Sequence, residues 1–472
     1  MATNNSVSGT QYVRYPSDYN LKQLTLFTSM IGDNSAIDLM TFLLEINLYE
    51  DIYSSSITGE VVINDALGLI SNYLLNGTEF IQIQLQKTSK DDVYISRNYR
   101  VYKISKRQIS DSNQYEVYVL NFCSEELLIS ENYRLSKSAK GKMIHEIIID
   151  VLTNYIKTKK DFYWDPTKGI YDFILPNKKL FETINWLSTY AQPLSGSSAD
   201  MLFYENSQGY HFHSLQTLYS QSPYQIYKFD PKNISNTPGR IDIQEQLTNA
   251  FDFEMLNFFD TLDAASNGTF ANKVIGVDIL TRTIYNGTFE YNNYNGKLLN
   301  SQKLTNGYQD RLGATIGTVA PVIPAGLETG TLRMSPSNKD EKINDYITQT
   351  VGGIDTVAND IMLEVYLPNR VSQLALANYM RIKITIPGDP NILAGSVVTF
   401  NTFGISPVTS SQTGNQRTLD PLYSGNYLVT AVRHIVKNNG YITVLEMCKD
   451  SVGVSYSNNN DGLQQFINGV QI

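Results

Sequence analysis

The sequence predicts a mainly β protein in which a small α+β domain lies between two antiparallel β-barrels. Three observations support this fold class. Strict alternation marks a half-buried strand at 81–86, where Ile81, Ile83 and Leu85 share one face and three glutamines the other. Asn-Gly, a preferred two-residue hairpin turn, occurs at seven places. The two β-rich regions end in similar sequences, which indicates a duplicated unit.

Chain length and composition bound the architecture and the partners. At 472 residues the chain is too long for one hydrophobic core, and 42% hydrophobic residues suffice for several packed units. A net charge of −9 argues against a surface that grips nucleic-acid phosphates. Residues 1–14 lack the apolar segment of a signal peptide, and no stretch approaches the roughly 20 apolar residues that span a bilayer. We expect no membrane insertion.

Further strands are expected where β-branched and aromatic residues alternate with polar ones, at 100–105, 115–123, 381–386, 397–400, 427–432 and 441–447. The middle of the chain has helical spacing instead. Ser138 is expected to cap a helix whose apolar face extends to Tyr155. A second helix should begin at Asn177 and end before Pro193, and a short third helix should occupy 369–377.

These elements divide the chain into successive units. An N-terminal extension (1–25) precedes the first barrel (26–125) and the α+β domain (126–215). The second barrel is expected in two segments (216–290 and 362–450), because residues 291–361 are rich in Gly, Asn, Thr and Pro and read as an insertion. A C-terminal tail (451–472) begins polar and ends apolar.

The internal repeat is visible in the last strands of each barrel. The first copy contains Asn98-Tyr99-Arg100-Val101, followed by Ile104, Tyr115, Val119, Leu120 and Cys123. The second contains Asn426-Tyr427-Leu428-Val429, followed by Val432, Tyr441, Val444, Leu445 and Cys448. Tyr and Val are common in any strand, so chance similarity is the alternative. We favour duplication, with both cysteines as small buried thiols rather than a disulfide scaffold.

No motif for catalysis or for a cofactor is present. Gly141-Lys142-Met143 lacks the upstream glycine and the Ser or Thr of a nucleotide-binding loop, and Gly-x-Ser-x-Gly does not occur. We therefore expect a non-enzymatic protein without a cofactor and assign no catalytic residue. His211 and His213 face one side of a strand and could offer two imidazoles to a metal, but no third ligand is evident. We favour surface or interface histidines after the turn at Gly209.

Charged clusters also have a structural interpretation. The adjacent carboxylates Asp91-Asp92, Glu125-Glu126 and Asp340-Glu341 do not suit glycoside hydrolysis, because neighbouring residues of a strand face opposite ways. We interpret them as solvated turn residues. The basic clusters at 137–142 and 157–160 are interpreted as the solvated ends of a helix.

Two sections of the sequence resemble a known family. The first comprises Leu393-Ala394-Gly395-Ser396-Val397-Val398-Thr399-Phe400, Ser424-Gly425-Asn426-Tyr427-Leu428-Val429, Val432-Arg433-His434 and 441–447. The second comprises Phe181-Glu182-Thr183-Ile184-Asn185-Trp186-Leu187 with Leu202-Phe203-Tyr204-Glu205-Asn206 and Gly209-Tyr210-His211-Phe212. They are similar to the closing barrel strands and the helix-then-strand segment of the baseplate hub family of contractile-tailed bacteriophages. The hub part of type VI secretion spike proteins is related to this family.

The resemblance covers roughly residues 20 to 450 in order of elements. It implies that the two barrels are tail-tube-like and that the chain forms a homotrimer with a pseudo-sixfold ring. Such a ring would join the sixfold tail tube, or tube-initiator proteins, to the threefold central spike. The insertion near 291–361 departs from the family and could contact a wedge or tube protein. A spike or lysozyme section after Ser451 is also lacking, so we expect the spike to be a separate chain.

The resemblance further implies a location in the tail baseplate of the virion, with assembly in the host cytoplasm. DNA would pass through the lumen without specific binding, which an acidic lumen favours. The alternative is a carbohydrate-binding, receptor-recognition tail protein, indicated by Tyr- and Asn-rich strands and loops. A glycan-cleaving enzyme is the weakest hypothesis, because only scattered carboxylates point to it.

Overall fold

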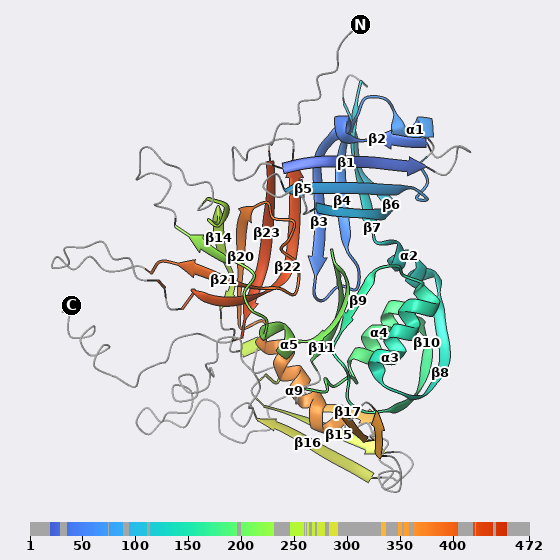
Figure 1. Ribbon diagram of the computed structural model, residues 1–472, viewed down its shortest axis with the longest axis vertical. Coiled ribbons are helices and arrows are strands. Elements are labelled where there is room, and N and C mark those ends of the chain that lie inside the picture. The colour runs from blue at the N-terminus through green and yellow to red at the C-terminus, as the bar shows by residue number, and fades with distance from the viewer. Residues whose placement is uncertain are drawn as a thin grey trace, which may run out of the picture.

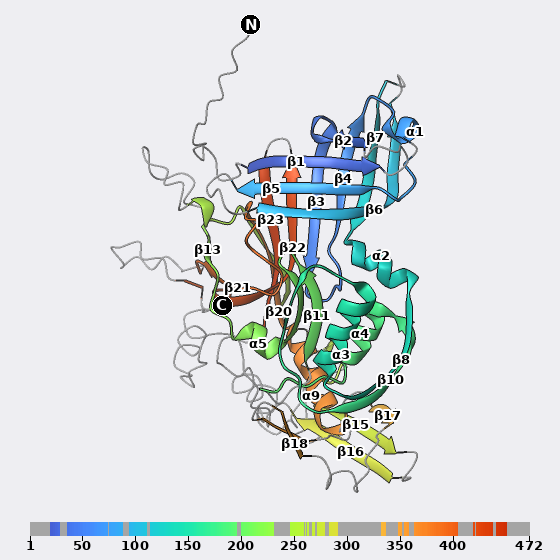
Figure 2. The ribbon, with the colours of Figure 1, turned by 45° about the vertical axis from the view of Figure 1, so that its right-hand side comes forward.

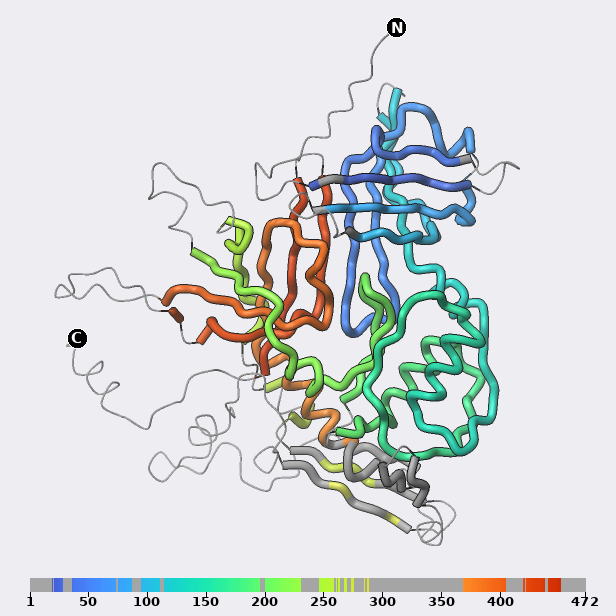
Figure 3. Tube along the Cα trace, in the orientation of Figure 1, coloured from blue at the N-terminus to red at the C-terminus, as the bar shows by residue number. Residues whose placement is uncertain are grey.

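The computed structural model describes most of the chain between Tyr19 and Asp450, and Figure 3 colours the parts whose placement is well defined. The described residues are 19–28, 35–73, 75–87, 94–110, 114–195, 200–230, 246–258, 260, 262–263, 267–269, 271–278, 283–290, 332–336, 348–351, 354–357, 363–404, 419–420, 422–437 and 440–450. They form a mainly β protein with three separate hydrophobic cores, as the sequence predicts.

The first core lies inside a unit of antiparallel strands at the N-terminal end. Its elements are β1 (Tyr19–Thr28), β2 (Ser35–Asp38), the 3-10 turn η1 (Met40–Phe42), β3 (Leu43–Asp51), β4 (Thr58–Asp65), α1 (Leu69–Tyr73), β5 (Phe80–Lys87), β6 (Tyr94–Ile109) and β7 (Glu116–Cys123). The strands pair in the order β3-β4-β7-β6-β5-β1. β1 and β5 cross the direction of β3 and β4 (Figures 1 and 2). Ile81, Ile83 and Leu85 are buried in the core between them, which confirms the alternation seen in the sequence.

The second core belongs to the α+β unit on the other side of α2 (Glu125–Asn132). Its elements are β8 (Arg134–Lys142), α3 (Ile144–Asp150), the π-helical turn η2 (Val151–Ile156), β9 (Asp161–Trp164), β10 (Tyr171–Lys179), α4 (Leu180–Ser188), β11 (Met201–Asn206) and β12 (Gly209–Ser214). α5 (Leu215–Tyr219) follows and packs its apolar residues into the third core. The apolar stripes of α3 and α4, which include Ile147, Ile148, Ile184 and Leu187, meet in one cluster because both helices are amphipathic.

The third core lies inside a second unit of strands. It is formed by β13 (Ile226–Phe229), β14 (Asp252–Phe258), β20 (Met380–Pro387), β21 (Val397–Thr402), β22 (Gly425–Lys437) and β23 (Gly440–Lys449). Between β14 and β20, the chain leaves this unit for β15 (Ala271–Asp278), β16 (Thr283–Glu290) and β17 (Leu332–Pro336), which form a sheet of their own. The hairpin of β18 (Thr348–Val351) and β19 (Ile354–Val357) follows, and α9 (Leu363–Leu376) leads back to β20.

The two strand units have the same pairing order. β3-β4-β7-β6-β5-β1 in the first corresponds to β14-β20-β23-β22-β21-β13 in the second, and the corresponding strands also follow one another in the same sequence order. Cys123 lies opposite Arg100 and Thr58, whereas Cys448 lies opposite Leu428 and Arg381. The register therefore makes the two cysteines equivalent, and both are buried and free.

The correspondence extends to one irregularity of the strands, whereas the second shift of β6 against β7, between Ser105 and Gln108, has no counterpart in β22. The register of β6 against β7 shifts just after Val101, and that of β22 against β23 shifts just after the equivalent Val429. In the first unit a backbone hydrogen bond from Leu39 N to Leu24 O links β1 to the chain just before β3. In the second unit the hydrogen bond from Ala250 N to Lys228 O links β13 to the chain just before β14. Each sheet thus returns to its first strand, as in a barrel. One pairing differs, because β13 is parallel to β21 whereas β1 is antiparallel to β5.

Several predicted boundaries were wrong. Ser138 does not cap a helix, because it pairs with Ile174 within the β8–β10 ladder, and α3 begins only at Ile144. The second helix begins at Leu180 rather than Asn177, since β10 continues through Lys179. α9 begins before Pro368, although proline favours the first turn of a helix.

Further expectations need correction or lie outside the described residues. β1 begins at Tyr19, so part of the expected N-terminal extension belongs to the first sheet. β15 and β16 lie outside the barrel sheet, so the second barrel does not reach residue 290. Tyr115 is exposed and precedes β7, whereas Tyr441 is fully buried, so these two tyrosines are not equivalent. Most of the insertion 291–361 and the whole tail 451–472 lie outside the described residues.

Candidate functional site

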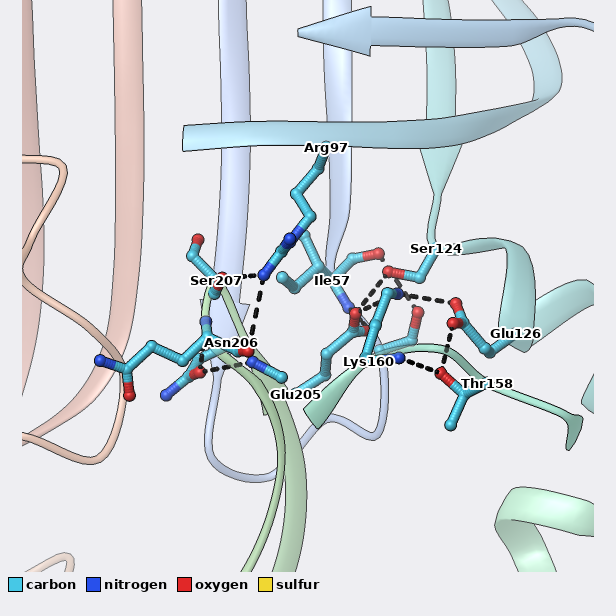
Figure 4. A network of polar contacts seen from close by, with 12 residues as sticks. Ile57, Arg97, Ser124, Glu126, Thr158, Lys160, Glu205, Asn206 and Ser207 are labelled. Atoms are coloured by element: carbon cyan, nitrogen blue, oxygen red, sulfur yellow. Dashed lines mark hydrogen bonds and ion pairs between the residues drawn. The ribbon is translucent and has the colours of Figure 1, made fainter. Parts of the chain in front are cut away.

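The three units meet around the hairpin of β11 and β12, which reaches the lower end of β3 (Figures 3 and 4). The hairpin tip, Ser207 and Gln208, receives the guanidinium of Arg97 from β6, with Nη2 2.5 Å from the Ser207 carbonyl oxygen. On the other side, the amide of Asn206 donates to the carbonyl of Ala394 at 3.3 Å. Because Ala394 belongs to the second barrel, this hairpin connects all three units.

Glu205 is the centre of a buried polar network at this junction (Figure 4). Its carboxylate accepts the Ile57 backbone N–H at 3.0 Å and the Ser124 hydroxyl at 2.9 Å, both from the first barrel side. Lys160 binds the same carboxylate at 2.6 Å and Glu126 at 2.7 Å. Burial raises the pKa of Glu205, and Lys160 opposes that rise. Several hydrogen bonds therefore compensate the desolvation of this charge.

Glu50, at the end of β3, makes a second three-way contact. It accepts the backbone N–H of Ser207 at 2.8 Å, the Ser207 hydroxyl, and the backbone N–H of Ala394 at 3.2 Å. It is completely buried, and burial raises its pKa to about 7. One carboxyl group thus holds a residue of the α+β unit and a residue of the second barrel against the first barrel.

The two barrels are also joined directly by backbone pairing. The second half of β22, from Ala431 to Lys437, pairs antiparallel with β3 from Asp51 to Glu45. Side chains reinforce this seam, which we call the barrel seam. Arg433 donates to Asn47 at 2.8 and 3.0 Å, and Lys437 lies 3.3 Å from Glu45. Both barrels consequently share one continuous sheet of thirteen strands.

His211 and His213 lie on one face of β12 but have different partners. Nε2 of His211 lies 2.8 Å from Asn206 Oδ1, and Nδ1 of His213 lies 2.9 Å from Asp165 Oδ1. Burial lowers the pKa of His211 to about 3, and its ring stacks between Tyr163 and Tyr204. Across the parts of the chain that the structure describes, no cluster of three potential metal ligands occurs. A hollow of about 340 Å³ lies beside the histidines.

Asp200, just before β11 and at the other end of the hairpin from its tip, provides a test of burial. It is fully buried, and burial raises its pKa from 3.8 to about 7. Its contribution to stability is therefore greatest below pH 3.8 and is lost as the pH rises through 7, by roughly 4 kcal/mol. Asp200→Asn should raise the free energy of unfolding at pH 8 by up to this amount and change it little at pH 4. Urea unfolding at both pH values, with exposed Glu131→Gln as control, measures the difference; equal effects at both would contradict it.

Some charged residues have roles that the sequence did not reveal. Glu126 was expected in a solvated turn and Lys160 at a solvated helix end, but both are part of the buried network around Glu205. Glu125 instead forms a more exposed pair with Arg100 at 2.9 Å. Glu50 and Glu205 were not singled out, although Glu205 stands out as a charge directly after the apolar run 201–204. Asp91-Asp92 and Asp340-Glu341 lie outside the described residues.

The comparisons with known proteins found phage tail proteins that are similar to this chain. No model of a known protein family matches the chain. In sequence, the chain is similar to the probable baseplate hub protein gp334 of Vibrio phage KVP40. The two are 20% identical over 418 residues, which cover 86% of this chain and 89% of the relative. This similarity confirms the resemblance to baseplate hub proteins that the sequence predicted.

Solved structures of tail proteins also align with nearly the whole chain. A tail protein of Neisseria meningitidis MC58 has a TM-score of 0.48 and 8% identity, covering 92% of this chain and 97% of its own. The 43 kDa tail protein of prophage MuSo2 from Shewanella oneidensis has a TM-score of 0.48 and 7% identity, covering 91% and 99%. No described helix is both long and apolar enough to cross a membrane.

Proposed function

We propose that this chain is a structural, non-enzymatic baseplate hub of a contractile phage tail. Three copies would form a ring in which six barrels alternate around the axis. One face of the ring would match a sixfold tail tube or its initiator proteins, and the other a threefold central spike. DNA would pass through the lumen during ejection, and the assembled protein would reside in the virion after assembly in the host cytoplasm.

The observation that carries this proposal is the strand-for-strand correspondence of the two barrels. A protein with two equivalent units per chain can present six similar surfaces with only three copies, which reconciles sixfold and threefold partners. The barrel seam supports the same geometry, because it already holds two units side by side with their sheets continuous. The similarity to a probable baseplate hub protein agrees with it.

The mass of the purified protein in solution tests the proposal. A trimer would weigh about 160 kDa, three times the 53.2 kDa of the chain, and should persist at micromolar concentration and bind a co-expressed spike protein. A chain that stays at the monomer mass and captures neither a spike nor a tube protein would contradict a hub function.

Carbohydrate binding is the second candidate function, and the hollow beside His211 is the observation that favours it. Tyr163, Gln208 and Gln221 line this hollow together with residues 393–396, so an aromatic ring and amide groups are available to a sugar. Binding to a glycan array by a protein that associates with neither tube nor spike would favour this function over the hub.

A further inference from the structure

Two strands of the continuous sheet, one in each barrel, have an edge or part of an edge that pairs with no strand in the described structure. β22 in the second barrel has both edges occupied, since β23 pairs along one edge and β21 followed by β3 pairs along the other. The equivalent strand β6 pairs with β5 only as far as Arg100, and residues 102–109 have β7 on one side alone. β14, the equivalent of β3, has only β20.

We propose that these two edges pair with each other between copies, so that β6 of one chain adds β14 of the next in the register of the barrel seam. This inference rests on the proposed ring and names its contact. Within the chain, the seam joins the second barrel to the first. Between chains, the same contact would join the first barrel to the second of a neighbour.

The register of the seam can be transferred through the equivalent strands. Val117 and Ile442 each stand six residues before the equivalent cysteine. Gln108 lies opposite Val117 and Ile435 lies opposite Ile442, so Gln108 is the equivalent of Ile435. Ile435 pairs with Asn47 across the seam. Glu60 and Lys383 are equivalent, because each lies two residues after the residue opposite its cysteine. Asn47 is opposite Glu60 and Glu254 is opposite Lys383, so Glu254 is the equivalent of Asn47.

The transfer therefore sets Gln108 opposite Glu254 of the neighbour. By the same rule, Ile104 lies opposite Phe258 and Ile109 opposite Phe253. The strands run antiparallel, as they do in the barrel seam.

The charges on the two edges are complementary in the same sense as at the barrel seam. There, the basic residues Arg433 and Lys437 of β22 approach Glu45 of β3. β6 carries Lys103, Lys106 and Arg107 along its unpaired stretch, and β14 carries Asp252 and Glu254. Asp252 is the register equivalent of Glu45. A basic edge thus faces an acidic edge in both contacts.

Exposed apolar side chains accompany both edges. Tyr102 and Ile109 on β6 are about half exposed, as is Met255 on β14. A long unpaired strand edge with apolar side chains is a template for pairing with another chain.

β6 and β14 lie on opposite sides of the molecule (Figure 1). Their contact is therefore head-to-tail, which generates a ring when the rotation closes.

Disulfide cross-linking tests the register. Gln108→Cys combined with Glu254→Cys should give, on mild oxidation, covalent dimers and trimers that reductant dissolves. Both positions are exposed at the strand edge, and native Cys123 and Cys448 are buried. The control pair, Gln108→Cys with Asp252→Cys, shifts one partner by two residues, beyond the roughly 7 Å of Cα separation that a disulfide spans. It should cross-link at least tenfold more slowly.

A second set of variants tests the same contact in case the double-cysteine variant does not fold. Lys106→Glu should weaken the oligomer at least tenfold, and Glu254→Lys in the same chain should restore it. Mass measurement before oxidation separates the two proposals. A trimer that cross-links at neither pair, or equally at both, overturns the β6–β14 junction and leaves the hub function standing. A protein that remains monomeric overturns both.

Discussion

Glu205→Ala is expected to lower the free energy of unfolding by roughly 3–5 kcal/mol, the usual cost of removing one partner from a buried ion pair. The substitution leaves the Ile57 N–H and the Ser124 hydroxyl without their acceptor, and Lys160 retains only Glu126. These groups lie at the contact between the first barrel and the α+β unit, so the orientation of the two units relative to each other should become less fixed. Urea unfolding and limited proteolysis near residue 124 measure both effects.

The matched control is Glu131→Ala, which breaks the exposed ion pair with Lys179. Exposed pairs contribute at most about 1 kcal/mol. If Glu205→Ala cost no more than Glu131→Ala, the buried network would not hold the junction together.

Gly209→Ala is expected to destabilise the protein by roughly 2–5 kcal/mol, because overpacking and backbone strain act together. Gly209 begins β12 with φ +153°, and a Cβ there would lie 2.3 Å from the carbonyl oxygen of Asp161. That carbonyl belongs to the backbone of β9, which pairs with β12 and cannot move aside without breaking the pairing. The tip of the β11–β12 hairpin, and with it Ser207, would shift away from Glu50.

Gly141→Ala separates the two causes. Gly141 also has a positive φ, +63°, but no atom lies within 4 Å of the position of its Cβ. Its substitution should therefore cost only the backbone strain, roughly 1–2 kcal/mol. Thermal melting of both variants in parallel provides the comparison, and equal losses would contradict the steric part of the argument.

The barrel strands could be predicted from sequence because they are half-buried, so that alternation records which side faces the core. Ile81, Ile83 and Leu85 illustrate this, and the buried Cys123 and Cys448 mark the same position of the repeat. The sequence comparison wrongly matched Tyr115 to Tyr441. Tyr115 lies in the loop before β7 and is exposed, so packing does not fix its position relative to the strand. Helix starts failed at Ser138 and Asn177 because strand pairing overrode the capping and proline signals.

The junction could not be predicted from local patterns. Glu205 meets Ile57 across 148 positions of sequence, and Glu50 meets Ala394 across 344. No periodicity encodes which distant backbone amide a carboxylate will accept. The clue that was available is a charged residue inside an apolar strand, because such residues are rarely buried without a partner.

The same physical logic links the junction to the proposed assembly. A trimeric ring requires that the two barrels of each chain keep a fixed relation, since small rotations between them would prevent closure. The barrel seam fixes this relation through backbone pairing, and Glu50 braces it by binding residues on both sides. Variants that loosen the junction should therefore reduce the trimer fraction as well as stability.

The rotational symmetry of the purified protein, measured by electron microscopy of single particles, tests the central claim most directly. The two equivalent barrels predict a ring with a central hole, with six similar lobes around it and true threefold symmetry once the α+β units are resolved. A compact monomer, or a ring whose number of chains is other than three, would contradict the claim that duplicated barrels create a pseudo-sixfold hub.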